Sequence, residues 1–317
     1  MTPTMSLTIL STDEAPMLEE ALAGAVAQEP DEIVVVDNAS TDATPELALR
    51  AGARLVRLEP RVSYVEAMNA SIADSHGDLV AFLQADTFVA PGYLEAARAP
   101  FADPLVGSVA PKLVRARGPR PEDRLDELDA AGMVVDRRRK NGLVGHGAPA
   151  SAYACRAEVF GADGAAAVYR RAALEDVAID GEVFDVDLER WASDADLAWR
   201  ARVLGWRCVY EPAALVHHVR SYSPSTRADM SEAARRMQFR NRYLMIAKNE
   251  GRELARDLPL VLGYEILALG HVLLRERHLL PAYREAWRCL PAARRRRRAI
   301  QRRRVAGRVP YGLRAPA

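Results

Sequence analysis

Cysteine is scarce in this chain, and its three cysteines lie far apart, at Cys155, Cys208 and Cys289. No C-x-x-C pair occurs, so the spacing excludes a cysteine-based metal framework and offers no pattern for disulfides. The first fourteen residues also lack a basic region followed by an apolar run, which is the mark of a secretory signal. We therefore expect a cytoplasmic protein, because free thiols suit a reducing compartment.

Glycine-rich phosphate loops are missing from the stretch around which the chain is organised, residues 33–42 with the sequence IVVVDNASTD. Neither G-x-G-x-x-G nor G-x-x-x-x-G-K-[ST] occurs there. The apolar run predicts a strand buried on both faces, and the short polar residues at its carboxyl end predict a turn and a helix cap. Ligands of open α/β sheets bind at that end, where Asp37 could accept hydrogen bonds from a base or a ribose. The alternative is that residues 37–42 form only a turn and an N-cap.

Short strands alternate with helices over the first eighty residues, which is typical of βαβ units and a mostly parallel sheet. At 317 residues the chain can form one large α/β domain with an appendage, or two domains. The predicted strands are residues 6–10, 33–36, 54–58 and 79–83, and the predicted helices are residues 17–26, 45–51 and 66–73.

A second acid, Asp86, follows the predicted buried strand 79–83. A carboxylate in that position could hold a divalent cation and a diphosphate, because Mg²⁺ and Mn²⁺ prefer oxygen ligands. One carboxylate is a weak signal. From this segment alone, a turn or helix cap before Pro91 is the better interpretation.

The middle of the chain, residues 115–156, is polar and rich in Arg, Asp, Gly and Pro. Its sequence DRRRKNG at residues 136–142 predicts an exposed hairpin or a mobile loop. Long loops inside a compact domain are often functional. A run of charges is more often just a solvated face.

Residues 193–205 predict a helix, with acids in the first turn, Arg later and Gly at the end. Asp194 and Asp196 are two positions apart and point in different directions, so at most one of them faces a reacting group while the other caps or braces. The alternative is that both only serve the helix dipole.

Two adjacent histidines, His217 and His218, follow a predicted strand at residues 206–210. On an extended segment their side chains point to opposite sides. One of them could bind a metal while the other faces the core or solvent. An ordinary structural role for each histidine is the alternative, and the better one for any single histidine.

Positive charge is concentrated at the carboxyl end. Residues 271–317 hold fourteen Arg and two Glu, a net charge of +12, which leaves −11 for residues 1–270 because the whole chain carries +1. The apolar run at residues 258–274 spans about 25 Å as a helix, short of the ~30 Å hydrocarbon core of a bilayer, and Glu265 interrupts it. A spanning helix is therefore not expected.

Two interpretations of the carboxyl end stay open. One is a helix in the plane of an anionic membrane surface, flanked by the Arg clusters at residues 294–298 and 302–304, since each basic residue near such a surface adds about 1 kcal/mol. The other is an ordinary helix packed on the protein and followed by a disordered basic tail. The Arg clusters lack interleaved aromatics or a known module, so no nucleic-acid partner is expected.

Six segments in the same order resemble the family 2 inverting glycosyltransferases, and among them the rhamnosyltransferase-like branch that uses nucleotide-diphosphate sugars. The resemblance covers roughly residues 5–250. The six matching pieces are residues 34–44 (VVVDNASTDAT), residues 67–69 (AMN), Ala85-Asp86-Thr87 with Pro91-Gly92, residues 194–200 (DADLAWR) with Gly205-Trp206, His218 with Ser221 and Ser223, and residues 240–244 (RNRYL).

The resemblance implies a GT-A fold in residues 1–225, with a mostly parallel central sheet, followed by a helical, partly apolar and Arg-rich extension in residues 226–317. It implies transfer of a sugar, with rhamnose the first candidate, from a dTDP- or UDP-linked donor to a glycan or lipid-linked acceptor in cell-surface polysaccharide synthesis. A divalent cation, Mg²⁺ or Mn²⁺, would assist.

The resemblance also assigns roles to particular residues. Asp37 is similar to the residue that contacts the base. Asp86 is similar to the last acid of the D-x-D metal motif, His218 to the histidine that completes the metal or diphosphate site, and Asp194 to the general base. By the same likeness Asn38, Asp42 and Asn69 belong to the nucleotide site, and Asp196 and Arg200 support the acceptor side.

Some positions depart from the family pattern. Gln84 stands where many relatives carry Asp or Asn, Ser193 replaces the Glu that usually precedes the base, and Ser63 and Ser71 occupy positions where glycine is common. These departures leave a second hypothesis open, a catalytically degenerate GT-A homologue that binds a nucleotide or a partner. The presence of both Asp86 and Asp194 favours the active enzyme.

Overall fold

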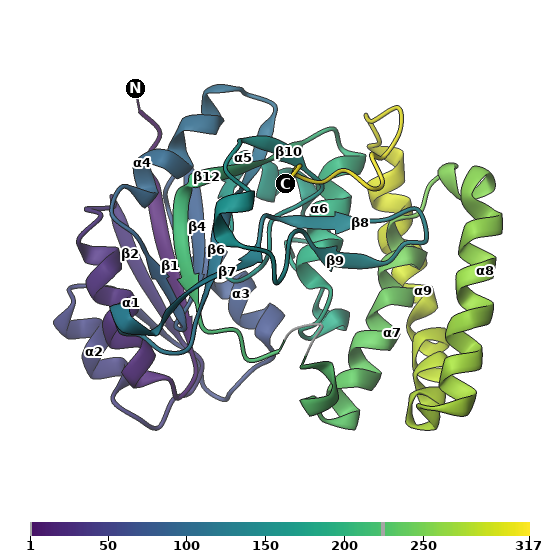
Figure 1. The fold of residues 1–317 in the computed structure, drawn as a ribbon, viewed down its shortest axis with the longest axis horizontal. Helices are drawn as coiled ribbons and strands as arrows, with labels where there is room; N and C mark the ends of the chain where they lie inside the picture. Colours follow the sequence, from purple (N-terminus) through teal and green to yellow (C-terminus); the bar gives the residue numbers. More distant parts are fainter. Residues whose placement is uncertain (1, 223–225) are drawn as a thin grey trace.

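The computed structural model describes residues 2–222 and 226–317, and its centre is a ten-stranded mixed sheet (Figure 1). Ser223 of the family pattern lies outside the described residues. The main strand order is β10-β12-β6-β11-β4-β1-β2-β3, while β5 pairs with β12 and β7 with β6. The strands are β1 (Met5–Ser11), β2 (Glu32–Asp37), β3 (Arg54–Arg57), β4 (Leu79–Gln84), β5 (Thr87–Val89), β6 (Val106–Ala116), β7 (Arg124–Ala130), β10 (Ala157–Val159), β11 (Val168–Arg170) and β12 (Arg207–His218).

The amino-terminal part of the sheet is parallel, as predicted. β1 pairs in parallel with β2 and β4, and β2 pairs in parallel with β3. The connecting helices are α1 (Ala15–Val26), α2 (Thr44–Arg50) and α3 (Tyr64–Ala73). Asp37 is in register with Ser11, and Gln84 with Leu10. The polar residues that follow β2 and β4 therefore emerge at the same edge of the sheet, about 10 Å apart across two strand spacings.

Hydrophobic residues cover both faces of this sheet, which explains the unbroken apolar run in β2. Val35 packs on one face with α1, α2 and α4 (Tyr93–Arg98). Val34 and Val36 pack on the other face with α3, α5 (Arg171–Val177) and α6 (Ser193–Val203). All three valines are fully buried, and complete burial of each such side chain stabilises the fold by about 1.5 to 3 kcal/mol.

The far half of the sheet is mixed. β11 runs antiparallel to both β4 and β6, while β12 runs parallel to β6. β5 pairs antiparallel with the end of β12, so that Thr87 lies opposite His218. The backbone N–H of Val219 also donates to the carbonyl of Asp86 at 3.0 Å. This pairing holds Asp86 beside His218, although 132 positions separate the two residues.

The polar middle segment forms the predicted hairpin, from β8 (Met133–Val135) and β9 (Asn141–Leu143). The interpretation of its charge run as a mobile or solvated loop is wrong for Arg139, which is fully buried. The Arg139 guanidinium pairs with Glu250 and, at 2.9 Å, with Asp257. These partners lie more than 100 positions along the chain, so the local sequence could not reveal that this arginine is internal.

Three long helices, α7 (Glu232–Asn249), α8 (Glu253–Leu274) and α9 (Leu280–Arg302), stand side by side away from β1, β2 and β3 (Figure 1). The alternative of a disordered basic tail is wrong, because residues 294–302 belong to α9. Arg296 of that helix pairs with Asp185 and Asp187. The chain then returns to the main body, where Val309 joins the same hydrophobic core as Ala195 and Leu197 of α6. Within residues 2–222 and 226–317, α8 is the one helix long and apolar enough to cross a membrane.

Short 3-10 helices complete the described part of the chain. They comprise Ala99–Ala102, Pro121–Asp123, Ala150–Ala152, Val186–Leu188, Arg227–Asp229 and Arg277–Leu279.

Candidate active site

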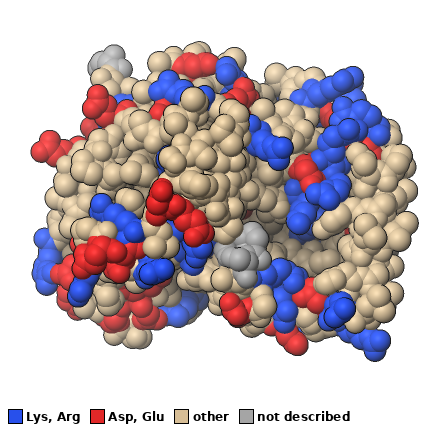
Figure 2. Space-filling model, in the orientation of Figure 1, with Lys and Arg blue, Asp and Glu red and all other residues tan. Residues whose placement is uncertain are grey.

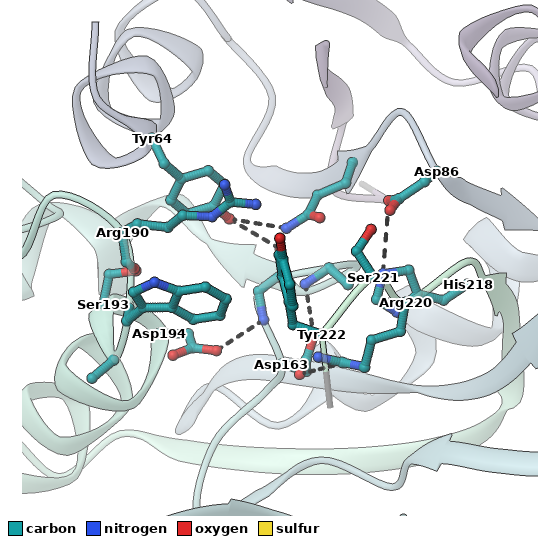
Figure 3. Close-up of a pocket in the computed structure, with 15 residues that line it drawn as sticks. Tyr64, Asp86, Asp163, Arg190, Ser193, Asp194, His218, Arg220, Ser221 and Tyr222 are labelled. Carbon is teal, nitrogen blue, oxygen red and sulfur yellow. Dashed lines mark hydrogen bonds and ion pairs between the residues drawn. The ribbon is translucent and has the colours of Figure 1, made fainter. Parts of the chain in front are cut away.

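A pocket opens beyond the ends of β4 and β12 and brings together three of the predicted site residues, Asp86, Asp194 and His218. Figure 3 shows Asp86 and His218 on one side of this pocket and Asp194 on the other. The cavity volume is about 120 Å³, well below the roughly 300 to 1,000 Å³ of pockets that enclose a whole drug-sized ligand. The pocket therefore has room for a cation and a small group, and a larger ligand must extend out of it. The other lining residues include Tyr64, Gln84, Asp163, Arg190, Trp191, Arg220 and Tyr222.

Asp86 offers an unpartnered oxygen to this pocket. Its Oδ1 is buried and has no hydrogen-bond partner. It lies 3.7 Å from His218 Nε2, which is too far for a hydrogen bond. Burial raises the pKa of Asp86, with the charge of His218 acting in the opposite direction. A buried carboxylate oxygen without a partner is costly, so this atom is suited to a ligand that carries positive charge.

The imidazole of His218 is oriented by a contact with Asp129. Its Nδ1 lies 2.8 Å from Asp129 Oδ2. Although burial alone raises the pKa of Asp129, hydrogen bonds from His146 and His218 and the charge of Arg220 lower it well below its usual range. Asp129 is therefore ionised and accepts the hydrogen bond from Nδ1 of His218, so in the neutral imidazole the lone pair is on Nε2, the nitrogen on the side of Asp86. Metal-binding histidines are commonly oriented by a carboxylate in this way.

The donor set of Asp86 and His218 fits a divalent cation. One carboxylate oxygen and one imidazole nitrogen suit Mn²⁺, and oxygen ligands suit Mg²⁺. No cluster of three or more His, Cys, Asp or Glu side chains in residues 2–222 and 226–317 has the geometry of a metal site. A cation held by Asp86 and His218 alone would leave coordination positions for phosphate oxygens and water.

His217 behaves as expected for the neighbour of a pocket histidine on a strand. It is buried, it does not line the pocket, and its Nδ1 has no hydrogen-bond partner. Burial, reinforced by the charge of Arg124, lowers the pKa of His217 to about 4. The imidazole is thus neutral at physiological pH.

Asp194 lies in the first turn of α6, where the helix dipole favours a negative charge. Its Oδ2 accepts a hydrogen bond from the backbone N–H of Gly164 at 3.3 Å, and its Oδ1 accepts one from Ala195 at 2.7 Å. Burial and then the nearby charge of Asp163 raise the pKa of Asp194 to about 6. The group is ionised at pH 7 and is a stronger base than an ordinary aspartate, which suits general-base catalysis.

Asp163 and Arg220 connect the two sides of the pocket. Arg220 donates to both carboxylate oxygens of Asp129, at 2.7 and 2.9 Å, and to Asp163 Oδ2 at 2.8 Å. Asp163 in turn influences Asp194 through its charge. Figure 3 shows the contact between Arg220 and Asp163 as a dashed line. Arg220 therefore bridges the carboxylate that contacts His218 and the carboxylate whose charge raises the pKa of Asp194.

Sequence reasoning missed Asp129, Asp163 and Arg220 as site residues. Asp129 lies in β7 within a polar stretch, and Asp163 lies in a loop before β11. Neither has a motif around it. Arg220 lies next to the predicted histidines, and a lone arginine two positions beyond a histidine is the only signal that could have drawn attention to it.

The loop before α6 is strained where it borders the pocket. Glu189 has φ 58° and Ala192 has φ 63°, in the left-handed region that non-glycine residues rarely adopt. Between them, the guanidinium of Arg190 lies 5.4 Å from the ring of Trp191 and 6.0 Å from that of Tyr64. Arg190 is exposed and lines the pocket. Strain at such a position is typical of a segment held in place for a ligand.

The residues predicted for the nucleotide lie at the same edge of the sheet, outside the residues that line the pocket. Asp37 is fully buried and accepts hydrogen bonds from the backbone of Ser40 at 2.9 Å and from Arg57 at 3.0 Å. The side-chain amide of Asn38 donates a hydrogen bond to the carbonyl of Val62 and accepts one from its backbone N–H. Asp42 accepts from the backbone N–H of Ala15, at the start of α1. The turn interpretation therefore describes part of what these residues do, and their contact with a nucleotide stays a prediction.

Asn69, Asp196 and Arg200 also lie outside the pocket lining. Asn69 donates to the carbonyl of Phe184 and accepts from its N–H. Asp196 is fully buried and pairs with Arg200 at 3.1 Å and with Lys248 at 2.7 Å. Asp194 lines the pocket while Asp196 braces α6 against α7, in agreement with the prediction that at most one of these two acids faces a reacting group.

The model of the Glycosyl transferase family 2 domain matches residues 6–178, more than half of the chain, so this chain belongs to glycosyl transferase family 2. The match ends before Asp194 and His218. The chain is 33% identical over 153 residues to the pre-mycofactocin glycosyltransferase of Mycobacterium tuberculosis, covering 48% of this chain and 29% of that protein. It is also 29% identical over 257 residues to the uncharacterized protein y4gI of Sinorhizobium fredii, covering 75% and 26%. The chain spans between 20% and 38% of the length of the curated relatives that it matches.

Solved structures share the fold. The mannosyltransferase PcManGT from Pyrobaculum calidifontis, in complex with GDP-Man and Mn²⁺, has a TM-score of 0.55 at 23% identity, over 92% of this chain and 76% of that one. TarS 1–349 of S. aureus in complex with UDP has a TM-score of 0.58 at 17% identity, over 94% and 90%. The chain therefore has the GT-A fold implied by the family resemblance, a mixed α/β sheet followed by a helical carboxyl-terminal region.

Proposed function

We propose that this chain is a metal-assisted glycosyltransferase that moves a sugar from a nucleotide-diphosphate donor to an acceptor hydroxyl with inversion. The observation that carries the proposal is the meeting of Asp86, His218 and Asp194 in one pocket. These residues come from three separate elements, and the last two lie beyond the part of the chain that the family model covers.

Asp86 and His218 would hold the cation. When bound, a divalent cation offsets the charge that develops on a departing diphosphate. Asp129 contacts Nδ1 of His218 and leaves Nε2 available 3.7 Å from the unpartnered Oδ1 of Asp86. The solved structures of this fold include one with GDP-Man and Mn²⁺ and one with UDP, GalNAc and Mn²⁺, which supports the proposal of a divalent cation as cofactor.

Asp194 would act as the general base. It would accept the proton of the acceptor hydroxyl as the oxygen attacks the sugar carbon from the side opposite the diphosphate, and a single displacement of this kind inverts the configuration. Its pKa is raised to about 6, which makes it a stronger base than an ordinary aspartate. Because this pKa is still below 7, the group is ionised at neutral pH and can accept a proton. Tyr64 and Trp191, which line the same pocket, would shield the reacting centre from water.

The nucleoside would extend from the pocket toward β1 and β2, since the cavity cannot enclose it. Asp37, Asn38 and Asp42 lie along that edge of the sheet. Arg190 has no ion-pair partner among the described residues and borders the pocket, so its guanidinium is available to the diphosphate. The donor expected from the resemblance is a dTDP- or UDP-linked sugar, with rhamnose the first candidate, and the acceptor is a glycan or lipid-linked glycan of the cell surface.

The test is thermal stabilisation of the purified chain by dTDP, UDP and GDP, each with and without Mn²⁺ or Mg²⁺. A ligand at 100 times its Kd adds about 2.7 kcal/mol to the free energy of unfolding. We expect metal-dependent stabilisation by dTDP or UDP that disappears in Asp86→Ala and persists in Asp126→Asn, a change at an exposed acid away from the pocket. Absence of stabilisation by every nucleotide would instead favour the degenerate homologue.

A further inference from the structure

The polarity of helix α8 is reversed relative to an ordinary surface helix. Its carboxylates point toward the protein, where Glu253 pairs with Arg304, Asp257 with Arg139, and Glu265 with Arg242. Apart from the buried Val261 and Val272, most of its large apolar side chains point outward. The large exposed ones are Leu258, Leu260, Leu262, Ile266, Leu267, Leu269, Leu273 and Leu274.

The exposure of this outward face, defined by those eight residues, is extensive. Ile266 and Leu267 are each 72% exposed and Leu274 is 79% exposed. Between residues 258 and 274 the one formally charged residue is Glu265, which is turned inward and accepts a hydrogen bond from Tyr243 at 2.6 Å. At 1.5 Å per residue the face is about 24 Å long. A continuous apolar surface of this kind on a soluble protein marks an interaction site.

Positive charge surrounds the outward face of α8. Arg252 and Arg256 lie at the beginning of the helix, where the hairpin arginine Arg137 also pairs with Asp257, and Arg275 and Arg277 follow its end. Figure 2 shows Lys and Arg side chains gathered over the region of α9, beside the tan surface of α8.

The arginines of helix α9 form two sets, one that faces inward and is paired with acids and one that is exposed. Arg296 faces inward and is paired with acids, as is Arg304 just after the helix. The exposed strip of α9 carries Trp287, which is 72% exposed, and a series of arginines without an ion-pair partner among the described residues. Those arginines are Arg284, Arg288, Arg294, Arg295, Arg298 and Arg302.

We propose that the outward face of α8 docks on an anionic lipid bilayer, with the helix lying in the plane of the interface. Apolar side chains would enter the acyl boundary while the surrounding arginines meet the headgroups, as in interfacial amphipathic helices. A spanning orientation is disfavoured because the inward carboxylates of α8 and their arginine partners would have to enter the hydrocarbon. The proposal goes beyond the proposed reaction and does not depend on it.

Charge decides between a bilayer and a second copy of the chain as the occupant of this face. Two copies that met through α8 would bring their arginine-rich surroundings together, and juxtaposed like charges oppose association. An anionic bilayer neutralises the same arginines and covers the apolar face at the same time.

The test is co-sedimentation of the full chain with vesicles of pure phosphatidylcholine and of phosphatidylcholine with 30% phosphatidylserine, at low and high salt. We expect binding to the anionic vesicles at low salt and much weaker binding to the neutral ones. The double variant Ile266→Ser/Leu267→Ser should bind at least about tenfold more weakly, since each change removes an apolar side chain from the interface. The matched control is Leu49→Ser/Leu105→Ser, two leucines that are 64% and 57% exposed elsewhere, and it should bind like the parent.

A second variant tests the contribution of positive charge to vesicle binding separately from that of the apolar face. Arg294→Gln/Arg295→Gln/Arg298→Gln should weaken binding to anionic vesicles and leave the residual binding to neutral ones unchanged. Unfolding curves of all variants establish that each one is folded. The proposal is overturned if the parent does not bind anionic vesicles at low salt, if the α8 variant binds like the Leu49/Leu105 control, or if sedimentation shows a dimer that only the α8 variant abolishes.

Discussion

The sheet half of the molecule and helix α8 place their charges in opposite ways. Around β1, β2 and β4 the valines and leucines are inside, and the acids lie where the strands end. In α8 the acids are inside, paired with arginines, and the leucines face outward. In the sheet the buried groups are apolar, whereas behind α8 they are paired charges. We attribute this difference to the environment that each exposed surface meets. The strand ends suit polar ligands, and α8 suits an apolar one.

The paired charges behind α8 give the largest expected effect on stability. Arg139→Ala removes the guanidinium partner of buried Glu250 and leaves Asp257 with only the half-exposed Arg137 and Arg256. The removal of one member of a buried pair typically costs about 3 to 5 kcal/mol. Urea denaturation with an unchanged m-value measures the loss. The control is Arg50→Ala, which removes a pair whose side chains are 69% and 65% exposed, where less than about 1 kcal/mol is expected. Equal losses in the two variants would mean that the Arg139 cluster is solvated and the comparison fails.

The contact between Asp129 and His218 is expected to have the next largest effect. Asp129→Asn removes the carboxylate that directs the Nε2 lone pair of His218, and loss of such a partner typically lowers metal affinity 10- to 100-fold. Titration of Mn²⁺ into the protein with dTDP or UDP measures this. His217→Gln is the matched control, since His217 is the neighbouring buried histidine outside the pocket. An unchanged Mn²⁺ affinity in Asp129→Asn would argue against His218 as a ligand.

A smaller effect is expected on the pH dependence of transfer. The pKa of Asp194 is raised to about 6, by burial and then by Asp163. Because the base must be ionised, kcat/KM should fall as the pH drops through about 6 and level off above it. Asp163→Asn removes a nearby negative charge, so the pKa of Asp194 should fall and the acid limb should move to lower pH. A limb that stays in place, or moves upward, would show that Asp194 does not control it.

Much of the parallel sheet could be predicted from the sequence. The strands at residues 33–36 and 79–83 consist of residues that favour buried strands, and their periodicity contains the necessary information. The same reasoning placed Asp86 and Asp194 at the ends of elements. Only the family resemblance linked them to His218, and the pairing of β5 with β12 is what brings His218 and Asp86 together.

The remaining site residues and the buried Arg139 could not be predicted, because their roles depend on distant partners. Arg220 is bound to Asp129 and Asp163, which lie 91 and 57 positions away. Arg139 lies in a run of charges that resembles any solvated turn, and its partners Glu250 and Asp257 are in the carboxyl-terminal helices. Local patterns carry no information about such pairs, and the resemblance to a family covers only residues that recur in that family's motifs.

The most direct test of the proposed reaction is a comparison of donor binding and sugar transfer in Asp194→Asn. The substitution keeps the shape of the side chain and removes the base. We predict that transfer falls by about 10² to 10⁴-fold while the Kd for the donor with Mn²⁺ changes less than about twofold, because general-base catalysis contributes on that scale. The Asp126→Asn control should match the parent in both measurements. Transfer that persists in Asp194→Asn, or that falls only in proportion to donor binding, would contradict the assignment of Asp194 as the base.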